Sequence, residues 1–373
     1  MKPKIVTLLT RFSWAGISTS VINTALYWES RGYLVEIIAV DSDPQQFPFP
    51  DFSRKRININ LVSFGNVFSL NAIIFTFKKR AVIKDSEFII AFDVGALLLA
   101  GCLCVPDYRN VIYHSLEFFE PRINSIKDRI KKLAERYLSN KLFCVFVQDS
   151  FRENYLRLDL RVNKFQHIYN SPTGEKIASN SNFFRNKFNI DKDKTIVLCV
   201  GSLIPDHYLV ELLNSLPYWS PSFVLVLHGW FPDKTIRVAA EKLINEFPGK
   251  LYISTSIFEN SDKFIPYQAC DILFVGFSSN SNNTKFAAGS AGKIFDAMKA
   301  GKPIIAFETP GMRSLIEGNG MGFVFSNPND INSNLNKIIG SYSQLCEASH
   351  FAYEKYEFKT QYDKAMSYLS RMI

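Results

Sequence analysis

The sequence predicts an α/β protein built from two doubly wound, parallel-sheet domains. Short apolar runs alternate with amphipathic segments along nearly the whole chain, which is typical of parallel strands connected by crossover helices. A polar interval rich in Ser, Asn and charged residues, from Ser171 to Asp193, interrupts this alternation near the middle. The chain has 373 residues, which is enough for two or three domains.

The first half is expected to form one Rossmann-like domain over residues 1–174. Its apolar runs are predicted strands at Ile5–Leu9, Leu34–Val40, Phe88–Phe92, Val111–Tyr113 and Leu142–Val147. The segments between them show helical spacing of apolar residues and are predicted helices at Thr19–Ser30, Leu70–Lys84, Val94–Cys104 and Ser125–Asn140.

The alternation restarts after the polar interval and predicts a second Rossmann-like domain over residues 175–350. Its predicted strands are Thr195–Val200, Phe223–Leu227, Leu251–Ser254, Ile272–Phe274 and Pro303–Phe307. Its predicted helices include Tyr208–Leu216, Thr235–Glu246 and Lys293–Ala300. Residues 351–373 are expected to be a C-terminal helix that packs back on the first domain.

Positive charge is concentrated in the first half of the chain. The net charge is +8, and residues 1–174 hold 23 Lys and Arg against 16 Asp and Glu. One dense basic cluster runs from Lys127 to Arg136, and another is Arg54–Arg56. Two interpretations stay open: solvated helix faces, or attraction to anionic lipid headgroups or a phosphorylated acceptor. Nucleic acid is not expected, because the clusters lack interleaved aromatic residues.

Cysteine spacing and hydropathy exclude several classes of protein. The six cysteines are spread along the chain without a Cys-x-x-Cys pair, and no histidine stands at ligand spacing from one of them. Neither a disulfide framework nor a zinc site is therefore expected. The longest apolar run, Phe88–Val105, is interrupted by Asp93 and Gly95 and falls short of the roughly 20 apolar residues of a membrane span. With no signal peptide at Met1, we expect a cytoplasmic protein, associated at most with the inner face of the membrane.

The segment from Gly289 to Ile305 carries the most chemical information. Its small residues leave backbone N–H groups accessible at the start of a helix, where the helix dipole favours anions. Lys293 adds a cation to that positive end, so it is expected to point at a bound anion. Asp296 is three residues further along the same face, where a carboxylate can accept hydrogen bonds from a ribose diol. The alternative is an ordinary helix that ends at Gly301.

A polar loop, Ser278–Thr284, follows a predicted buried strand on the side where open α/β sheets bind ligands. Both a mobile lid over a site and an inert loop remain open for this segment.

The Lys293–Ala306 segment resembles the nucleotide-sugar signature of the retaining family 4 of GT-B glycosyltransferases, known as glycosyl transferases group 1. That signature often reads K-[IL]-[FY]-E-x-M-A-x-G-K-P, and here it continues into Pro310-Gly311 and the glycine-rich stretch Gly318–Gly322. In the family, the lysine binds the donor phosphate and the acidic residue binds the ribose. The resemblance carries these roles over to Lys293 and Asp296, with Asp in place of the usual Glu.

The resemblance extends over most of the chain with weaker motifs. His114 matches a family histidine near the donor sugar, which implies a catalytic role beside Lys293. Backbone groups that would hold the donor phosphates fall in three glycine-containing turns. Those residues are Gly16, Gly201, Ser202, Gly289, Ser290, Ala291 and Gly292.

Three positions depart from the family pattern. Ala288 stands where the family usually has a second acidic residue that contacts the donor sugar. Ser202 replaces a phosphate-binding arginine, and His207 lies where a Lys-Gly pair would be. Lys285 and Arg11 are the cations that could substitute.

The resemblance implies two Rossmann-like domains facing each other across a cleft, and transfer of a sugar with retention from a nucleotide sugar. The expected acceptor is a glycan or a polyprenyl-linked acceptor, and neither a metal nor another cofactor is expected. Two alternatives remain: a catalytically silent GT-B subunit that binds a partner transferase or glycan, and a GT-B sugar-nucleotide epimerase.

Overall fold

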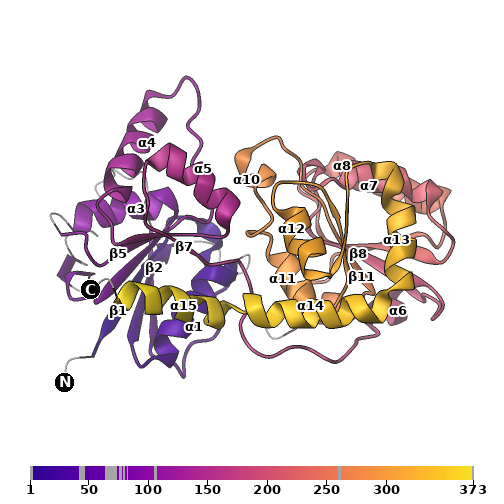
Figure 1. Cartoon of the computed structure of the whole chain (residues 1–373), viewed down its shortest axis with the longest axis horizontal. Helices are drawn as coiled ribbons and strands as arrows, with labels where there is room; N and C mark the ends of the chain where they lie inside the picture. Colours follow the sequence, from indigo (N-terminus) through magenta and orange to yellow (C-terminus); the bar gives the residue numbers. More distant parts are fainter. Residues whose placement is uncertain are drawn as a thin grey trace. The chain divides into compact units, whose positions relative to one another are not determined.

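The chain divides into two compact units in a computed structural model, which describes residues 3–41, 47–63, 74, 78, 80, 81, 83–104, 107–258 and 262–371. The first unit comprises Met1–Asn170 with Gln361–Ile373, and the second comprises Ser171–Thr360 (Figure 1). Each unit is built around its own parallel sheet.

The first unit contains a 7-stranded parallel sheet in the order β3-β2-β1-β4-β5-β6-β7. Its strands are β1 Ile5–Leu9, β2 Leu34–Val40, β3 Ile57–Val62, β4 Phe88–Phe92, β5 Val111–His114, β6 Cys144–Val147 and β7 Phe165–His167. The helices are α1 Thr19–Ser30, α3 Asp93–Leu103, α4 Ile126–Ser139 and α5 Ser150–Leu160, with a 3-10 turn at Ser13–Ile17. Side chains of Ser18, Ser125 and Asp149 cap the starts of α1, α4 and α5.

The second unit contains a 6-stranded parallel sheet in the order β10-β9-β8-β11-β12-β13. Its strands are β8 Thr195–Ser202, β9 Phe223–Trp230, β10 Leu251–Ser254, β11 Ile272–Val275, β12 Ile304–Phe307 and β13 Gly322–Phe325. Its helices are α6 Phe183–Phe188, α7 Leu209–Ser215, α8 Lys234–Glu246, α9 Ile265–Gln268, α10 Asn282–Lys285, α11 Gly292–Lys299, α12 Met312–Ile316, α13 Ile331–Gly340 and α14 Tyr342–Tyr356.

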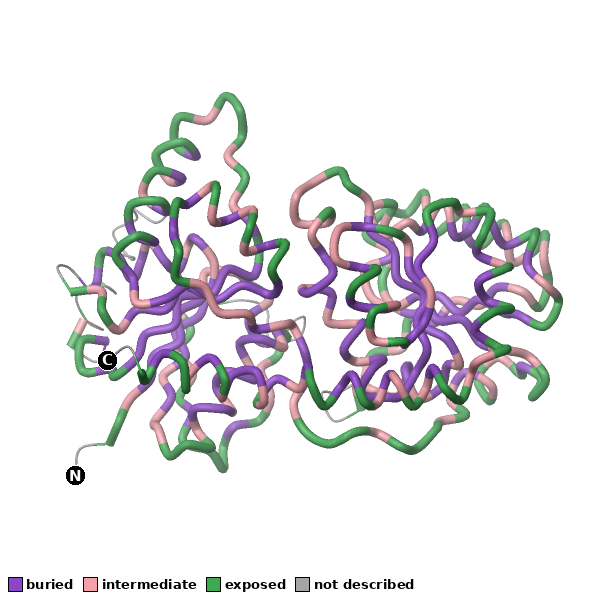
Figure 2. Tube along the Cα trace, in the orientation of Figure 1, coloured by how far each residue is buried: buried purple, intermediate pink, exposed green. Residues whose placement is uncertain are grey.

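These sheets confirm the predicted fold class of two doubly wound α/β domains. The central strands are buried from end to end, as Figure 2 shows for the middle of each unit, because helices cover both faces of a parallel sheet. Strands β3, β7 and β13 were not predicted. Strand β3 carries Asn58 and Asn60, which donate hydrogen bonds to Glu36 on the neighbouring strand. Because of these two polar residues, its sequence is not a continuous apolar run. The predicted helix Leu70–Lys84 lies largely outside the described residues.

The strand order fixes where each sheet opens a crevice. In the first sheet the chain moves outward in opposite directions from the neighbours β1 and β4, and in the second from β8 and β11. Ligands of open α/β sheets bind outside the carboxyl ends of such neighbouring strands. In the second unit, a ligand is therefore expected to bind beside the residues that follow β8 and β11.

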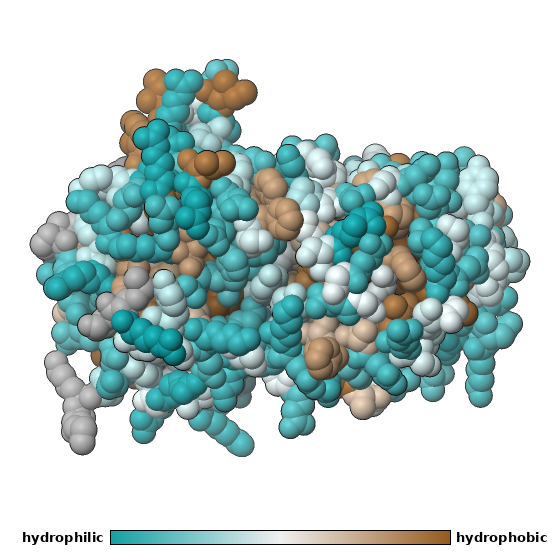
Figure 3. All heavy atoms as spheres, in the orientation of Figure 1, coloured by the Kyte–Doolittle hydropathy of each residue, from teal (hydrophilic) through white to brown (hydrophobic). Residues whose placement is uncertain are grey.

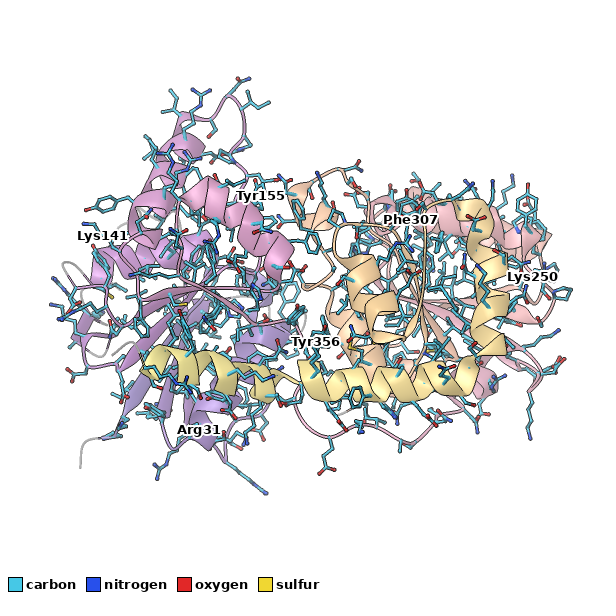
Figure 4. All side chains as sticks on the ribbon, viewed as in Figure 1. Arg31, Lys141, Tyr155, Lys250, Phe307 and Tyr356 are labelled. Atoms are coloured by element: carbon cyan, nitrogen blue, oxygen red, sulfur yellow. The ribbon has the colours of Figure 1, made fainter. Side chains whose placement is uncertain are left out.

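The last two helices belong to different units. Helix α14 lies in the second unit, where the Tyr353 hydroxyl donates hydrogen bonds to the carbonyls of Pro172 and Gly174. Helix α15, Phe358–Ser370, contributes its residues from Gln361 onward to the first unit. There Asp363 accepts hydrogen bonds from Tyr27 and from Arg31, which Figure 4 labels below this helix. The segment 351–373, expected as one helix, therefore begins inside α14.

A buried carboxylate holds the loop that follows β5. Asp93, at the junction of β4 and α3, has a left-handed backbone with φ +60°, and its Oδ1 accepts the amides of Leu116 (2.7 Å) and Glu117 (2.9 Å). Burial raises the pKa of Asp93 to about 7, although the two backbone hydrogen bonds act in the opposite direction. The buried Arg152 donates to the Leu116 carbonyl at 2.7 Å, so the same loop is held from both sides.

Asp93→Asn is expected to stabilise the protein by an amount that grows with pH. The folded protein keeps a proton up to about pH 7 that the unfolded chain releases near pH 4, so stability falls as the pH rises through this window. Asparagine retains an acceptor oxygen, tolerates the left-handed backbone and carries no charge. Urea unfolding should show a gain that increases by as much as about 3 kcal/mol between pH 4.5 and 7.5.

The matched control is Asp107→Asn, which removes an exposed carboxylate whose pKa is lowered by Arg109 and which should not stabilise the protein. If Asp93→Asn increased the free energy of unfolding equally at both pH values, the raised pKa of Asp93 would be contradicted.

Candidate functional site

The candidate site lies at the carboxyl edge of the second sheet, beside the neighbouring strands β8 and β11. Gly201 and Ser202 end β8, Phe277 follows β11, and Lys293 is in the first turn of α11. The Lys293 ammonium is 3.8 Å from the position that a Cβ on Gly201 would occupy. It also lies 5.5 Å from the centre of the Phe277 ring. The structure thus brings together Gly201, Ser202 and Lys293, which the sequence places far apart.

Lys293 is a charge without a local counter-charge. Burial lowers its pKa, and no oxygen in the described part of the chain accepts a hydrogen bond from its ammonium group. The adjacent His207 does not offer a negative charge: burial and then Lys293 lower its pKa to about 4, so the ring is neutral at pH 7. An ammonium in this position at the positive end of a helix attracts an anion.

The turn before α11 presents backbone amides to the same place. Ser290 and Ala291 donate their amides to the carbonyl of Ala287 at 3.0 and 2.8 Å, which winds the chain tightly just before the helix starts at Gly292. Gly289 lies within this turn and is buried. The first amides of a helix have no acceptor within it, so those of Gly292 and Lys293 are available to a ligand at the helix start.

Two glycines keep the ends of β8 and β9 free of side chains. Gly201 has φ +106°, and Gly229 opposite it has φ +146°. A Cβ on Gly229 would come within 1.9 Å of the Gly201 carbonyl oxygen. Any side chain at Gly229 would therefore push β8 and β9 apart at the candidate site.

The turn Pro205–Tyr208 fills the space where the family places a Lys-Gly pair. His207 Nδ1 lies 2.7 Å from the Ser202 carbonyl oxygen, and its ring packs edge-on against Phe277. The Tyr208 ring stacks on Phe307, labelled in Figure 4, with 3.5 Å between the ring centres. The departure at His207 thus forms a packed and uncharged wall.

The polar loop Ser278–Thr284 is anchored to this turn. Asp206 accepts hydrogen bonds from Ser278 Oγ (3.1 Å) and Asn280 Nδ2 (2.7 Å), and its carbonyl accepts the Ser278 amide. Ser281 and Thr284 form a capping box at the start of α10. The loop therefore has a defined conformation in the second unit.

Asp296 faces a different set of groups from Lys293. Its carboxylate is 3.7 Å from the Lys263 ammonium and hydrogen-bonds to Tyr267, and Lys299 is a further charged neighbour. Burial raises the pKa of Asp296, and Lys263 is the main group that counteracts this shift. A ribose diol would have to share the carboxylate oxygens with these two partners.

His114 and Gly16 lie in the first unit and are both enclosed. The His114 ring packs between Phe92 and Phe146, it is completely buried, and neither ring nitrogen has a hydrogen-bond partner among the described residues. Burial lowers its pKa to about 3, so the ring is neutral. A Cβ on Gly16 would come within 2.2 Å of the Phe47 carbonyl oxygen, so close packing alone requires glycine there.

The two cations considered as substitutes have different surroundings. Arg11 follows β1, and its Cβ is 3.0 Å from the position of a Cβ on Gly95 in α3, so it lies at the β1–β4 edge of the first sheet. Lys285 is exposed on α10, where its ammonium lies 5.4 Å from the Phe286 ring centre. At Ala288, the position of the missing acidic residue, the side chain is buried.

The sequence alone did not identify Lys263, Tyr267 or Phe277 as part of the site. Phe277 stands directly after a predicted strand, so its position at the carboxyl edge could have been noticed. Lys263 and Tyr267 precede the same strand, β11, and reach Asp296 only through the folded arrangement of α9 and α11.

Two kinds of feature are absent from the described residues. No group of three or more His, Cys, Asp and Glu side chains there is arranged to hold a metal ion. Among the helices that the structure describes, none combines the length and the hydropathy needed to cross a bilayer.

Comparison with known proteins agrees with the geometry. Residues 180–348 match the family model "Glycosyl transferases group 1", which covers most of the second unit. No curated protein matches the chain in sequence.

Solved structures match the fold over nearly the entire chain. Sucrose-phosphate synthase (tll1590) from Thermosynechococcus elongatus has a TM-score of 0.73 at 15% identity, covering 99% of this chain and 98% of that chain. Anabaena Alr3699/HepE in complex with UDP-glucose has a TM-score of 0.72 at 14% identity, covering 98% and 99%. WaaG, a glycosyltransferase involved in lipopolysaccharide biosynthesis, has a TM-score of 0.64 at 14% identity, covering 97% and 98%.

At these identities the structural matches establish the fold, and the family match identifies the domain that carries Lys293 and Asp296. The chain has the GT-B fold of two Rossmann-like units, and its residues 180–348 match the family model of the glycosyl transferases group 1.

Proposed function

We propose that the protein transfers a sugar from a nucleoside-diphosphate sugar to a hydroxyl group of a glycan or polyprenyl-linked acceptor, with retention of configuration and without a metal ion. The observation that carries this proposal is the Lys293 ammonium, which has no acceptor within the described residues and lies beside Gly201 at the carboxyl edge of the second sheet. A diphosphate supplies the missing negative charge.

Lys293 would stabilise the leaving group. As the glycosidic bond breaks, negative charge grows on the β-phosphate, and an ammonium held in a poorly solvated site interacts more strongly with that growing charge. The amides at the start of α11 add donors that need no reorganisation during the reaction. The chain's own electrostatics can therefore support departure of the nucleotide.

Asp296 would accept hydrogen bonds from the ribose. Its neighbour Lys263 affects this role through the charge of the carboxylate. Burial raises the pKa of the carboxyl group, and the Lys263 ammonium opposes that shift and so favours the charged form. A charged carboxylate accepts stronger hydrogen bonds from hydroxyl groups than a protonated one.

His114 would position the donor sugar or the acceptor. Its ring is neutral and both nitrogens lack partners within the described chain, so a sugar hydroxyl would satisfy one of them. Because the ring is fully buried, this role requires the side chain or its loop to move when substrate binds. Gly16 would contribute only its backbone.

Two positions that contact the donor in the family carry other side chains in this protein. Ala288 provides no carboxylate for a sugar hydroxyl, and Ser202 provides no cation for the diphosphate. HepE was solved with UDP-glucose, so UDP-glucose is the first donor to test. Retention and family 4 membership follow from the resemblance to the Lys293–Ala306 signature, and both belong to the proposal.

The same departures favour a second candidate, a catalytically silent subunit that binds a partner transferase or glycan. A site that lacks the carboxylate at Ala288 and the cation at Ser202 could retain nucleotide binding without turnover. Release of sugar from a panel of UDP- and GDP-sugars separates the two candidates: binding without any turnover would support the silent subunit. Recovery of a C2-inverted donor sugar would instead indicate an epimerase.

Lys293→Ala is expected to weaken binding of UDP by about 10- to 100-fold, because it removes the charged donor to the diphosphate. Thermal shift should show this directly. UDP at 100 times its wild-type Kd stabilises the folded wild type by about 2.7 kcal/mol, and the variant at the same UDP concentration should keep only about 0.4 to 1.4 kcal/mol of this.

The control for Lys293→Ala is Lys242→Ala, which removes an exposed lysine from α8 of the same unit and should leave the shift unchanged. Equal shifts for wild type and Lys293→Ala would contradict the proposed diphosphate site.

Asp296→Asn is expected to weaken UDP binding without affecting inorganic pyrophosphate. If the carboxylate binds the ribose, removing its charge should reduce the affinity for UDP by about 5- to 50-fold. The affinities for UDP and 2′-deoxy-UDP should then differ less in the variant than in the wild type. Calorimetric titration of both nucleotides into both proteins gives the double-mutant cycle.

Glu241→Gln, which removes an exposed carboxylate on α8, is the matched control for Asp296→Asn. Additive losses from the deoxy ligand and the Asp296 variant would show that Asp296 does not contact the ribose.

A further inference from the structure

Helix α4 is turned with its polar face toward the protein and its apolar face toward solvent. Of its charged residues, Asp128, Lys132 and Glu135 are buried. The apolar residues at helical spacing are exposed instead: Ile126 (74%), Ile130 (60%), Leu133 (62%) and Tyr137 (59%), with Ile123 (83%) just before the helix. We call these five residues the α4 ridge. A surface helix of a globular protein normally shows the opposite orientation.

Buried polar contacts fix this orientation. Lys132 Nζ lies 2.8 Å from Glu135 Oε2 and 2.7 Å from Asp159 Oδ2, and the Tyr113 hydroxyl donates to Glu135 Oε1 at 2.8 Å. Leu138, on the same inner face, packs against Gly101 of α3. Rotating the apolar ridge inward would break this network and leave buried charges unpaired, which is strongly destabilising. The ridge is therefore held outward by the fold.

The exposed charges within residues 121–141, the segment that carries the ridge, are all positive. Between residues 121 and 141 the only acidic residues are Asp128 and Glu135, and both are buried and paired. The exposed charged side chains of that segment are cations: Arg122, Lys127, Arg129, Arg136 and Lys141. Figure 3 shows apolar residues gathered with hydrophilic ones on the part of the surface where Figure 1 labels α4. Exposed apolar side chains and exposed cations thus share one surface.

We propose that the α4 ridge docks the protein onto an anionic lipid bilayer, with the apolar residues entering the boundary between headgroups and acyl chains. An apolar face bordered by Lys and Arg is what an interfacial helix requires, since apolar burial and attraction to anionic headgroups act together. A second copy of this chain fits the surface poorly, because a two-fold contact would bring the same cations of both copies together, and residues 121–141 offer no exposed acid to pair them.

The position of the ridge suits the proposed function, on which this step rests. Helix α4 begins after the loop that leaves the carboxyl end of β5, so Ile123 and Ile126 lie toward the carboxyl edge of the first sheet. That edge is where open parallel sheets bind ligands. A bilayer bound to the ridge would therefore lie next to the edge that would receive an acceptor carried on a polyprenyl chain.

The test is co-sedimentation of the full chain with vesicles of phosphatidylcholine alone or with 30% phosphatidylglycerol added. The wild type is expected to bind the anionic vesicles and to be released by salt, because the attraction is screened. The triple variant Ile126→Ser, Ile130→Ser, Leu133→Ser should bind at least about tenfold more weakly, because less apolar surface enters the bilayer. Lys127→Gln with Arg129→Gln should lose the preference for anionic vesicles.

A matched control replaces exposed apolar residues elsewhere, Val238→Ser with Phe351→Ser, and should bind vesicles like the wild type. Thermal shift with UDP, run on every variant, verifies folding and reports the nucleotide site separately, so failure of docking is distinguished from failure of the proposed transfer reaction.

Three outcomes would overturn the inference. The first is absence of wild-type binding to anionic vesicles, and the second is equal binding by the ridge variant. The third is a wild-type dimer in light scattering that the ridge variant converts to monomer, since this would assign the ridge to a second copy of the chain.

Discussion

The candidate site in the second unit is built around the ammonium group of Lys293, which lies at the positively charged start of helix α11. Lys293 stands in the first turn of α11, is partly buried, and has a neutral His207 for a neighbour rather than a carboxylate. Nothing in the described chain offsets that charge, so the folded state bears an electrostatic penalty that an anion relieves. Glycines at positions 201 and 229 keep the adjoining strand ends bare, and the packed turn with Tyr208 closes the opposite wall. Together, the ammonium group, the bare strand ends and the packed turn form a site that can bind a phosphate group.

Electrostatic roles in this site are divided between two parts of one short helix. Lys293 faces the strand ends, whereas Asp296 faces α9 with Lys263 and Tyr267. The two side chains therefore have separate surroundings although they are only three residues apart, and only Asp296 has charged neighbours. Such a separation allows a nucleotide to be held at its phosphates and at its sugar by groups that do not neutralise each other.

The sequence predicted the fold well because its strands are buried on both faces and read as continuous apolar runs. It missed β3 because Asn58 and Asn60 use their amides on Glu36, a pairing invisible before the strands are aligned. It predicted that Lys293 and Asp296 share one helix, since that depends only on local spacing. The contacts of Asp296 with Lys263 and the enclosure of His114 depend on packing between distant segments, and neither leaves a local pattern. The inverted orientation of α4 was equally hidden, because periodicity locates an apolar face without saying whether that face meets protein or solvent.

The return of the last helix to the first unit has a consequence for the order in which the protein can mature. Asp363 and Tyr362 contact Tyr27 and Trp28 on α1, and Gln361 accepts the amide of Tyr169. Translation reaches these partners only after every strand of the second sheet has been made. Until then, Tyr27 and Trp28 on α1 lack these partners on the ribosome, so completion of the first unit waits for residues 361–371 to emerge.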